Sequence, residues 1–386
     1  MNVDIIGWGH TRFGKSRSSL EELIVEAATA ALVHAQLPAE EIDEIVLGHF
    51  NAGFSTQDFT AALVLQADPA LRFRPATRVE NACASGSAAV HAGIRAIKSG
   101  EARKVLVVGA ERMSDTPGPE VGRNLLRAAY LKEEGETEGG FAGLFGQVAL
   151  AYFKRHGDKS DALAAIAAKN HRNGAGNPLA HLQKDLGLEF CRTTSPDNPL
   201  VAGPLRRTDC SPVSDGAAAL VLSLDTAHDG QRAVKIAATA HAQEFMPAAR
   251  RDPLLMEGCR EAWGRALSRA DWRIDDLSFV ETHDCFTIAE LLQYEAMGLA
   301  PYGRGADVVA SGLTEADGRL PINRSGGLKA KGHPIGATGV SMHVMAAMQL
   351  TGEAPSAMQL QRADRAGIFN MGGLAVANYV SLLEAR

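Results

Sequence analysis

Helix-like and strand-like patterns of apolar positions alternate along the chain, which predicts a layered α/β protein. Residues 19–35 carry an apolar stripe at helical spacing, and residues 42–47 form an apolar run typical of a buried strand. An acidic turn separates the two, and residues 256–270 and 277–282 repeat the same helix, turn and strand. Two similar units so far apart predict an internally duplicated fold, although chance similarity between amphipathic helices would produce the same pattern.

A second correspondence supports the duplication. Residues 83–99 predict a helix rich in small residues, which Gly100 would end, and the β-branched strand 104–108 follows it. A comparable helix is expected over about residues 338–350. Each of these helices follows a glycine-containing loop that carries a candidate catalytic residue.

Between residues 116 and 198 the periodic pattern is lost. This segment holds several prolines, a charged run at 132–138 and a glycine-rich stretch at 139–143, with one helical pattern at 161–171. A core strand resumes at 217–224. We therefore expect an insertion that covers a functional site.

Composition narrows the class of protein. The 386 residues are enough for two packed domains or one duplicated core, and 46% apolar with 22% charged residues is typical of a globular protein. The net charge of -6, without a long Lys/Arg run, argues against nucleic acid as a partner. No apolar run approaches the ~18 residues that a membrane span needs, and no signal peptide pattern opens the chain. A cytoplasmic enzyme is the expectation, and a phosphate-bearing ligand would require a local basic patch.

The five cysteines are an odd number without short paired spacings, which predicts reduced thiols and neither disulfides nor a structural zinc site. We expect no bound metal. Cys191, Cys210 and Cys259 have no activating sequence context and are predicted to be packing residues.

Cys83 lies at the start of the predicted helix, in the sequence ENACASGS. Free amides and the positive end of the helix dipole would favour its thiolate, and small neighbours would let a substrate and a facing helix approach. The alternative is a small buried hydrophobic residue.

His333 is the single histidine of the glycine-rich segment NRSGGLKAKGHPIGATG, where Pro334 restricts the backbone before it. A rigidly held imidazole could activate a cysteine nucleophile as a base, or donate a hydrogen bond to a developing oxyanion. A purely structural turn is the alternative.

Two further segments carry candidate chemistry. His283, Asp284 and Cys285 follow a predicted strand, at the end of which residues commonly line a cleft in α/β sheets. Burial is the alternative for Cys285. The glycine-rich loop expected at 367–374 precedes a closing strand at 375–382, and it could direct a backbone amide at a substrate oxygen or form a plain β-turn.

Together these motifs resemble the thiolase superfamily along almost the whole chain. The resemblance rests on ENACASGSAAVHAGIRAIKSG, VLVVGAERMS, DCSPVSDGAAALVL and NRSGGLKAKGHPIGATG, in the family's order. The His-Asp-Cys-Phe sequence, with Asn370 where most thiolases place a second catalytic cysteine, is similar to the sterol-carrier-protein type. We expect the protein to lack the lipid-carrier domain that is appended to some members of this type.

The resemblance implies the thiolase fold, an α/β fold of two duplicated βαβαβαββ halves that form a five-layered αβαβα core. The N-terminal half would span residues 1–228, with an inserted loop domain at about 116–208, and the C-terminal half residues 229–386. A homodimer or a dimer of dimers is expected.

A mechanism follows from the resemblance. His333 would accept the proton of Cys83, and the thiolate would attack an acyl-CoA thioester, with the backbone amides of Cys83 and Gly372 stabilising the oxyanion. Cys285 would remove a proton from the α-carbon of a second acyl-CoA, while His333 and His283 hold the enolate oxygen. The product would be a 3-ketoacyl-CoA, thiolysis being the reverse, and the shared acyl carrier predicts ping-pong kinetics.

The implied enzyme is an acyltransferase of the acetyl-CoA C-acetyltransferase or 3-ketoacyl-CoA thiolase type, with a role in lipid metabolism such as fatty acid β-oxidation. Its substrates would be coenzyme A thioesters, without a permanently bound cofactor. Arg206 and Arg207 are candidate contacts for the coenzyme's phosphates, with a solvated basic pair as the alternative, and Ser325 is a third candidate.

Two other readings use the same residues. One is a decarboxylating ketoacyl synthase, a class that also uses cysteine and histidine. The other is the thiolase-like subunit of a heteromeric thiolase or retro-aldolase that works with a small zinc-binding OB-fold partner. The sequence leaves open the acyl chain and the direction of the reaction.

Overall fold

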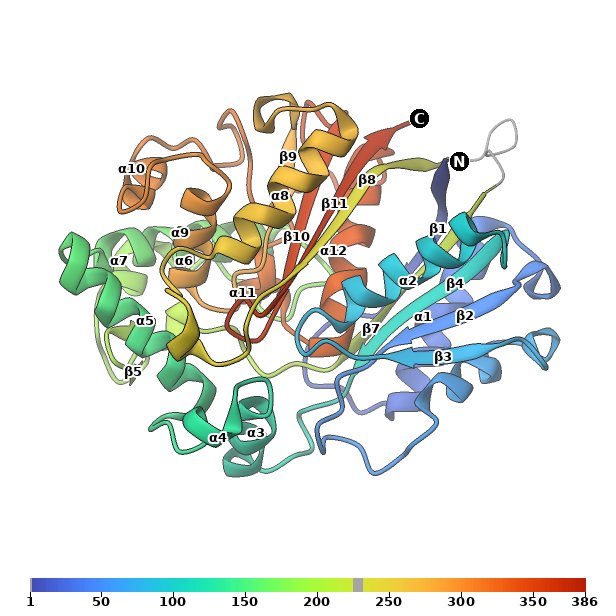
Figure 1. Ribbon diagram of the computed structural model, residues 1–386, viewed down its shortest axis with the longest axis horizontal. Coiled ribbons are helices and arrows are strands. Elements are labelled where there is room, and N and C mark those ends of the chain that lie inside the picture. Colours follow the sequence, from blue (N-terminus) through green and yellow to red (C-terminus); the bar gives the residue numbers. More distant parts are fainter. Residues whose placement is uncertain (1, 225–231) are drawn as a thin grey trace.

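The computed structural model describes residues 2–224 and 232–386, and Figure 1 shows how the elements are arranged. The predicted boundary between residues 228 and 229 lies outside the described residues. The N-terminal half contains β1 (Val3–His10), α1 (Leu20–Ala35), β2 (Glu44–Gly48), the 3-10 helices η2 (Thr60–Ala67) and η3 (Pro69–Leu71), β3 (Ala76–Val79), α2 (Ser85–Ser99), β4 (Lys104–Glu111) and β7 (Gly216–Ser223). The C-terminal half contains β8 (Val234–Gln243), α8 (Glu257–Ala270), β9 (Phe279–Glu281), α9 (Thr287–Ala296), α10 (Gly305–Ala310), α11 (Gly327–Lys331), α12 (Ile335–Leu350), β10 (Arg365–Gly372) and β11 (Ala377–Ala385).

The order of the strands confirms the predicted duplication. One nine-stranded mixed sheet runs β3-β2-β4-β7-β1-β8-β11-β10-β9. From the centre outward, the N-terminal half contributes β1, β7, β4 and β2, and the C-terminal half contributes β8, β11, β10 and β9. In both halves the first strand along the chain is therefore followed by the last, the second-last and the second. The bridge between Val280 and Ile322 is parallel, as is the pairing of β2 with β3, and it stands at the position that β3 holds in the other half. The two half-sheets meet where β1 pairs with β8 over three residues.

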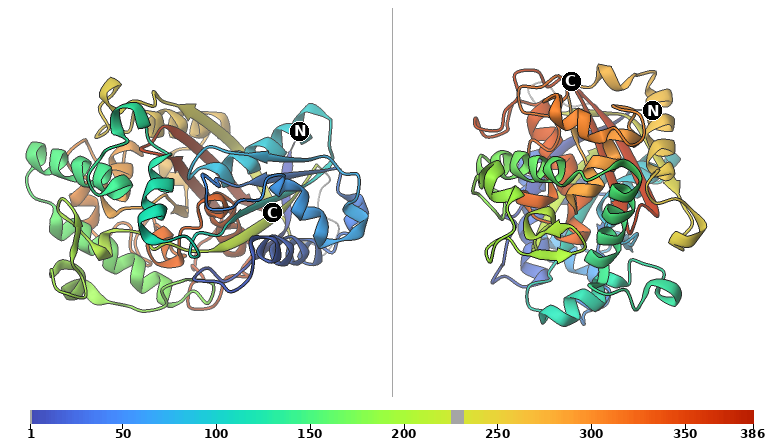
Figure 2. Two further views of the ribbon diagram at one scale, coloured as in Figure 1. Left: turned by 90° about the horizontal axis from the view of Figure 1, so that it is seen from below. Right: turned by 90° about the vertical axis from the view of Figure 1, so that its left-hand side faces the viewer.

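Alternation of side chains along the strands explains the layers. In β4, Leu106 and Val108 belong to an apolar cluster with α1, whereas Val105 and Val107 face the opposite way and share a cluster with α2. Helix α12 packs against α2 and against strands of both half-sheets, while α8 covers β8 and β11. The helices α2 and α12 therefore lie between the half-sheets, with α1 and α8 outside, as the two views of Figure 2 illustrate.

The insertion folds into a mainly helical unit beside the C-terminal half, where Figure 1 shows its green helices next to α9 and α10. Its helix α6 packs against α7, α9 and α11. The insertion contains α3 (Gly118–Leu126), α4 (Leu131–Glu134), α5 (Gly140–His156), α6 (Ser160–Ala175), α7 (Gly187–Arg192), β5 (Leu200–Ala202) and β6 (Leu205–Arg206).

One predicted element is wrong. Residues 367–372 were expected in a loop, but they belong to strand β10, and the turn begins only at Gly373. The glycine at 367 serves close packing, because a Cβ there would lie 2.6 Å from the Trp263 ring.

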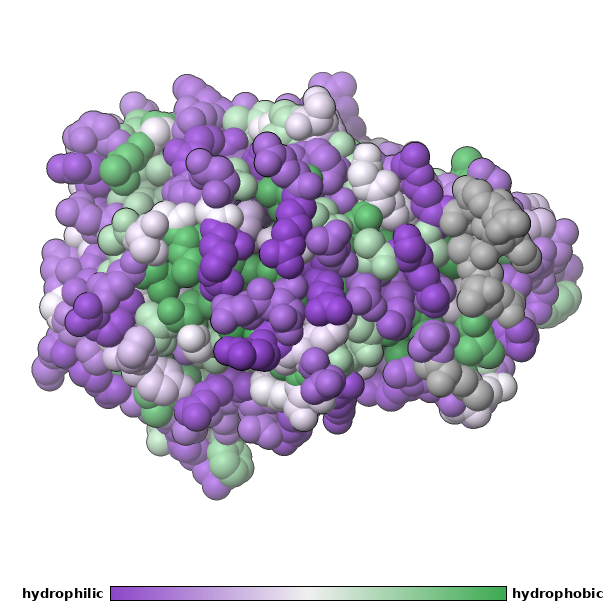
Figure 3. Space-filling model, turned by 90° about the horizontal axis from the view of Figure 1, so that it is seen from above, coloured by the Kyte–Doolittle hydropathy of each residue, from purple (hydrophilic) through white to green (hydrophobic). Residues whose placement is uncertain are grey.

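The face of the molecule shown in Figure 3 is mostly hydrophilic, with groups of hydrophobic residues between the hydrophilic ones. Within the described residues, none of the helices has the length and apolar character needed to cross a membrane.

Candidate active site

The turn between β3 and α2 presents Cys83. Ala82 adopts a left-handed conformation with φ of 49°, which is uncommon for a residue other than glycine. The Ser85 hydroxyl secures this turn, since it accepts a hydrogen bond from the Asn81 amide at 2.9 Å and donates one to the Ala82 carbonyl at 2.7 Å. The backbone thereby holds Cys83 just before the helix, with 4% of the residue exposed.

Small residues let the two central helices touch near their N-termini. A Cβ on Gly86 would lie 2.7 Å from the amide nitrogen of Gly339, and a Cβ on Gly339 would lie 2.1 Å from the amide nitrogen of Ser87. Any side chain at either glycine would force α2 and α12 apart. The glycines therefore bring the loops that precede both helices, and the Cys83 and His333 they carry, to one place.

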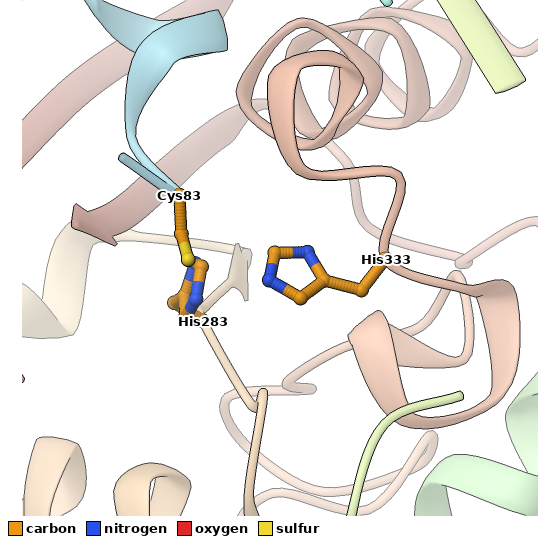
Figure 4. Close-up of side chains that lie close together, drawn as sticks. All are labelled: Cys83, His283 and His333. Atoms are coloured by element: carbon orange, nitrogen blue, oxygen red, sulfur yellow. The ribbon is translucent and has the colours of Figure 1, made fainter. Parts of the chain in front are cut away.

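Three buried side chains converge there. The Cys83 sulfur and one ring nitrogen each of His283 and His333 lie within 4.8 Å of one another. The two imidazole rings meet edge to face, with centroids 5.1 Å apart. Figure 4 shows the sulfur beside the His283 ring, with the His333 ring facing both from the α12 side. Two predicted catalytic residues from distant parts of the chain, and a third from the loop after β9, thus share one site.

Thr338 orients His333. Its hydroxyl donates to the Pro334 carbonyl at 3.0 Å, so the same oxygen is left to accept a hydrogen bond from His333 Nδ1 at 2.7 Å. The hydrogen of the neutral ring is then on Nδ1, and Nε2 keeps a free lone pair. A free lone pair is what a base for a thiol requires.

Asn370 gives His283 the opposite tautomer. Its side-chain nitrogen donates to the Cys83 carbonyl at 3.1 Å and contacts His283 Nδ1 at 2.8 Å, where it donates its second hydrogen. His283 Nδ1 is then an acceptor, and Nε2 carries the hydrogen. Nε2 is buried and has no hydrogen-bond partner among the described residues. An N–H that points into a site without a partner is suited to hold a substrate oxygen, and it leaves no lone pair there for a metal ion.

Electrostatics correct one expectation. Burial raises the pKa of Cys83 to about 12, despite the lowering effect of the Gly373 and Cys83 backbone amides. Burial, followed by the nearby Lys331 charge, lowers the pKa of His333 to about 3. The helix start was expected to favour a thiolate, but desolvation outweighs it, and the resting pair at neutral pH is a thiol beside a neutral imidazole. Proton transfer is therefore expected together with attack on a substrate.

Cys285 and Gly373 complete the surroundings of the sulfur. Burial raises the pKa of Cys285 well above its usual value, and the proximity of the Cys83 sulfur raises it further. The Gly373 amide is directed at the Cys83 sulfur. Gly372, predicted as an oxyanion donor, is the preceding residue, and its role stays a prediction.

Asp284, between the two predicted catalytic residues of its loop, connects the loops of the site. It accepts hydrogen bonds from the amides of Leu328 at 2.6 Å and Lys329 at 3.2 Å, and from the Asn170 side chain at 2.7 Å. Burial raises the pKa of Asp284 to about 7. One carboxylate thus holds the His283 loop, the segment before His333 and the insertion together.

A cavity of about 680 Å³ lies between the insertion and the strand β7 side of the core. Exposed cations Lys15, Lys184 and Arg207 line it, and Lys329 lies on its wall with 4% exposed. The Ser211 amide, also in the lining, donates to the Cys285 carbonyl at 2.9 Å, so the cavity reaches the backbone of the catalytic cluster.

Of the three predicted coenzyme contacts, only Arg207 lines this cavity. Arg206 lies outside the lining, and the Nε of Arg206 donates a hydrogen bond to the Thr194 hydroxyl at 3.3 Å. Ser325 is fully buried and its hydroxyl donates to Glu281 at 2.5 Å, which leaves it without surface for a ligand. Cys210 was expected to be a packing residue but is half-buried in the lining. Lys329 was missed, although it stands in the histidine segment itself.

A duplicated α/β core with a buried cysteine and two histidines where its two halves meet is characteristic of the thiolase fold. Residues 3–225 match the family model "Thiolase, N-terminal domain", and residues 238–385 match "Thiolase C-terminal domain-like". The chain belongs to the thiolase family, and the predicted superfamily and acyltransferase class are thereby confirmed.

Individual relatives agree with this assignment. An acetyl-CoA acetyltransferase of Methanothermobacter thermautotrophicus is 35% identical over 382 residues, with 96% of each chain covered. Sterol carrier protein 2 of Oryctolagus cuniculus is 30% identical, over 91% of this chain and 66% of that protein. The solved structure named "Ltp2-ChsH2(DUF35) aldolase" aligns with a TM-score of 0.79 at 21% identity, over 100% of this chain and 98% of that one, and supports the fold alone.

Proposed function

We propose that this protein makes or cleaves 3-ketoacyl-CoA through an acyl group carried on Cys83. The observation that carries the proposal is the cluster itself: a buried sulfur, an imidazole with a free lone pair and an imidazole with a free N–H, within 4.8 Å. These are the three functions that acyl transfer through a thioester requires.

In the first half-reaction, His333 Nε2 takes the Cys83 proton as the sulfur attacks the thioester carbonyl. The amides of Cys83 and of Gly372 or Gly373 stabilise the oxyanion, and coenzyme A leaves with the proton. In the second, Cys285 as its thiolate removes an α-proton from another acyl-CoA, and the resulting enolate oxygen is held by the Nε2–H of His283 and, through a water molecule, by His333. The carbanion attacks the acyl group, a carbon–carbon bond forms, and the Cys83 thiolate is released as leaving group.

The test is to incubate the purified chain with acetyl-CoA or acetoacetyl-CoA and to locate the covalent adduct by mass spectrometry. An acetyl group on Cys83 with turnover by the chain alone supports the proposal. Activity only after addition of a small zinc-binding partner would favour the heteromeric alternative, and activity only with malonyl thioesters a decarboxylating synthase.

We place coenzyme A in the cavity of 680 Å³, where basic residues can meet its phosphates. Lys329 is buried there, and none of the ion pairs found among the described residues neutralises it. Burial lowers the pKa of Lys329, and the nearby Asp284 and Asp209 carboxyl groups only partly offset this, so a phosphate oxygen in the cavity would stabilise the charged form of the side chain.

Replacing Lys329 with methionine is therefore expected to raise KM for acetyl-CoA about tenfold or more while changing kcat little. Steady-state kinetics measures both values. Lys154→Met, an exposed cation on α5 outside the lining, is the matched control, and equal effects of the two variants would exclude a coenzyme contact for Lys329.

A homodimer is the proposed assembly, because β3 is a sheet edge without a strand beyond it among the described residues. Phe59 and Phe73 near this edge are 88% and 84% exposed and have φ of 53° and 71°, which is unusual for aromatic residues. Sedimentation should give a dimer, and a Phe59→Glu, Phe73→Glu double variant a monomer. A monomeric wild-type chain would end this proposal.

Free cysteines throughout the chain support the proposed cytoplasmic location. We also propose a role in lipid metabolism, including fatty acid β-oxidation, because the proposed reaction makes or cleaves 3-ketoacyl-CoA.

A further inference from the structure

A second cavity, of about 520 Å³, lies between α5, the segment before α8 and the turn after β10. Leu144, Val148 and Ala151 of α5 form one apolar wall, and Leu254 and Leu374 form the other. Neither the acyl carrier nor the coenzyme cavity uses this space. Its volume is in the range of small-molecule sites.

Two segments of the chain run from the neighbourhood of the reacting sulfurs to this cavity. Leu374 follows Gly373, whose amide is directed at the Cys83 sulfur. On the other side, Phe286 follows Cys285 and stacks on Phe145 of α5, with ring centroids 4.4 Å apart.

Helix α5 connects the second of these segments to the cavity. Leu144 and Val148 are the neighbours of Phe145 along the buried face of α5, and both line the cavity. Cys83, Phe145, Phe286 and Leu374 belong to one buried apolar cluster, so a chain that extends from the Cys83 sulfur toward the cavity would meet apolar side chains.

We propose that this cavity receives the acyl chain of the thioester, and that the preferred substrates carry an apolar chain well beyond two carbons. The proposal rests on the proposed function, because it requires an acyl group on Cys83. It assigns the chain to a space separate from the coenzyme cavity.

The rim of the cavity determines what the far end of the chain can be. Glu133, Glu134 and Asp252 bring three carboxyl groups, and Arg155 is the single cation of the lining. Arg155 is already paired with Asp252 at 2.8 Å. A chain that ends in a carboxylate would meet acidic groups without a free cation, so an uncharged end is preferred.

The test uses Val148→Phe, which fills the cavity from its apolar wall, and thiolysis of acetoacetyl-CoA and 3-oxododecanoyl-CoA. The kcat/KM for the long substrate should fall about tenfold or more, while that for acetoacetyl-CoA stays within about twofold. Leu150→Phe is the matched control, since this residue is 53% exposed and lies on the opposite side of α5, outside the lining.

Each other outcome overturns the inference. An equal loss with both substrates means that the substitution disturbs catalysis, and no loss with the long substrate means that the chain lies elsewhere. A wild-type protein that rejects the long substrate has the same consequence. If Val148→Phe fails to fold, Ala151→Phe at the more exposed end of the wall replaces it. Absence of any acyl adduct on wild-type Cys83 would instead remove the proposed function.

Discussion

Replacing Cys83 with alanine is expected to abolish acyl-enzyme formation and to lower turnover at least about a thousandfold. Among the three clustered groups it is the only one that can carry an acyl group as a thioester, and both imidazoles and the Gly373 amide are arranged around its sulfur. Mass spectrometry after incubation with acetyl-CoA measures the adduct, and acetoacetyl-CoA thiolysis measures turnover.

The matched control is Cys259→Ala. Cys259 is fully buried in α8, on the outer layer of the C-terminal half, and its loss should leave the adduct and its rate unchanged. Because the alanine at 83 removes one small atom from a turn held by Ser85 and Asn81, the fold should persist, which circular dichroism can verify. Turnover that survives in Cys83→Ala, or an adduct on a different residue, would refute the acyl carrier assigned here.

The meeting of Cys83 and His333 could be predicted from sequence because of the duplication. Each residue lies just before a small-residue helix, and α2 and α12 occupy equivalent positions in the two halves. Equivalent helices that pack together through glycines bring their preceding loops together. The prediction that Gly100 ends this helix is also confirmed, since Gly100 follows α2 in a left-handed conformation.

What the sequence could not predict depends on burial and on long-range contacts. The protonation of Cys83 follows from desolvation by burial, which outweighs the local helix effect. Strand β10 was mistaken for a loop because Gly367 makes room for Trp263, a contact across elements. The tautomer of His283 depends on Asn370, 87 residues away. Lys329 is a candidate ligand-binding residue only because the structure places it in the lining of the 680 Å³ cavity, which the sequence does not reveal.

Replacing Cys285 with alanine should separate the two half-reactions. The residue is 3% exposed, and its thiol lies close enough to the Cys83 sulfur for Cys83 to raise the pKa of Cys285. Attack on the first thioester does not require it, so acetylation of Cys83 should persist. Proton transfer at the α-carbon does require it, and condensation and thiolysis should fall about a hundredfold to ten-thousandfold.

The raised pKa of Cys285 also sets the sign of the pH dependence. At neutral pH the thiol form dominates, which suits thiolysis, where Cys285 gives a proton to the departing enolate. Condensation needs the thiolate, so its rate should rise with pH through the alkaline range while Cys83 remains able to accept an acetyl group. In Cys285→Ala this rise should disappear. Cys191→Ala, fully buried in α7, is the control that should keep it. If condensation continues at the wild-type rate, another group is the base; if acetylation is lost as well, Cys285 supports the structure of the site rather than one chemical step.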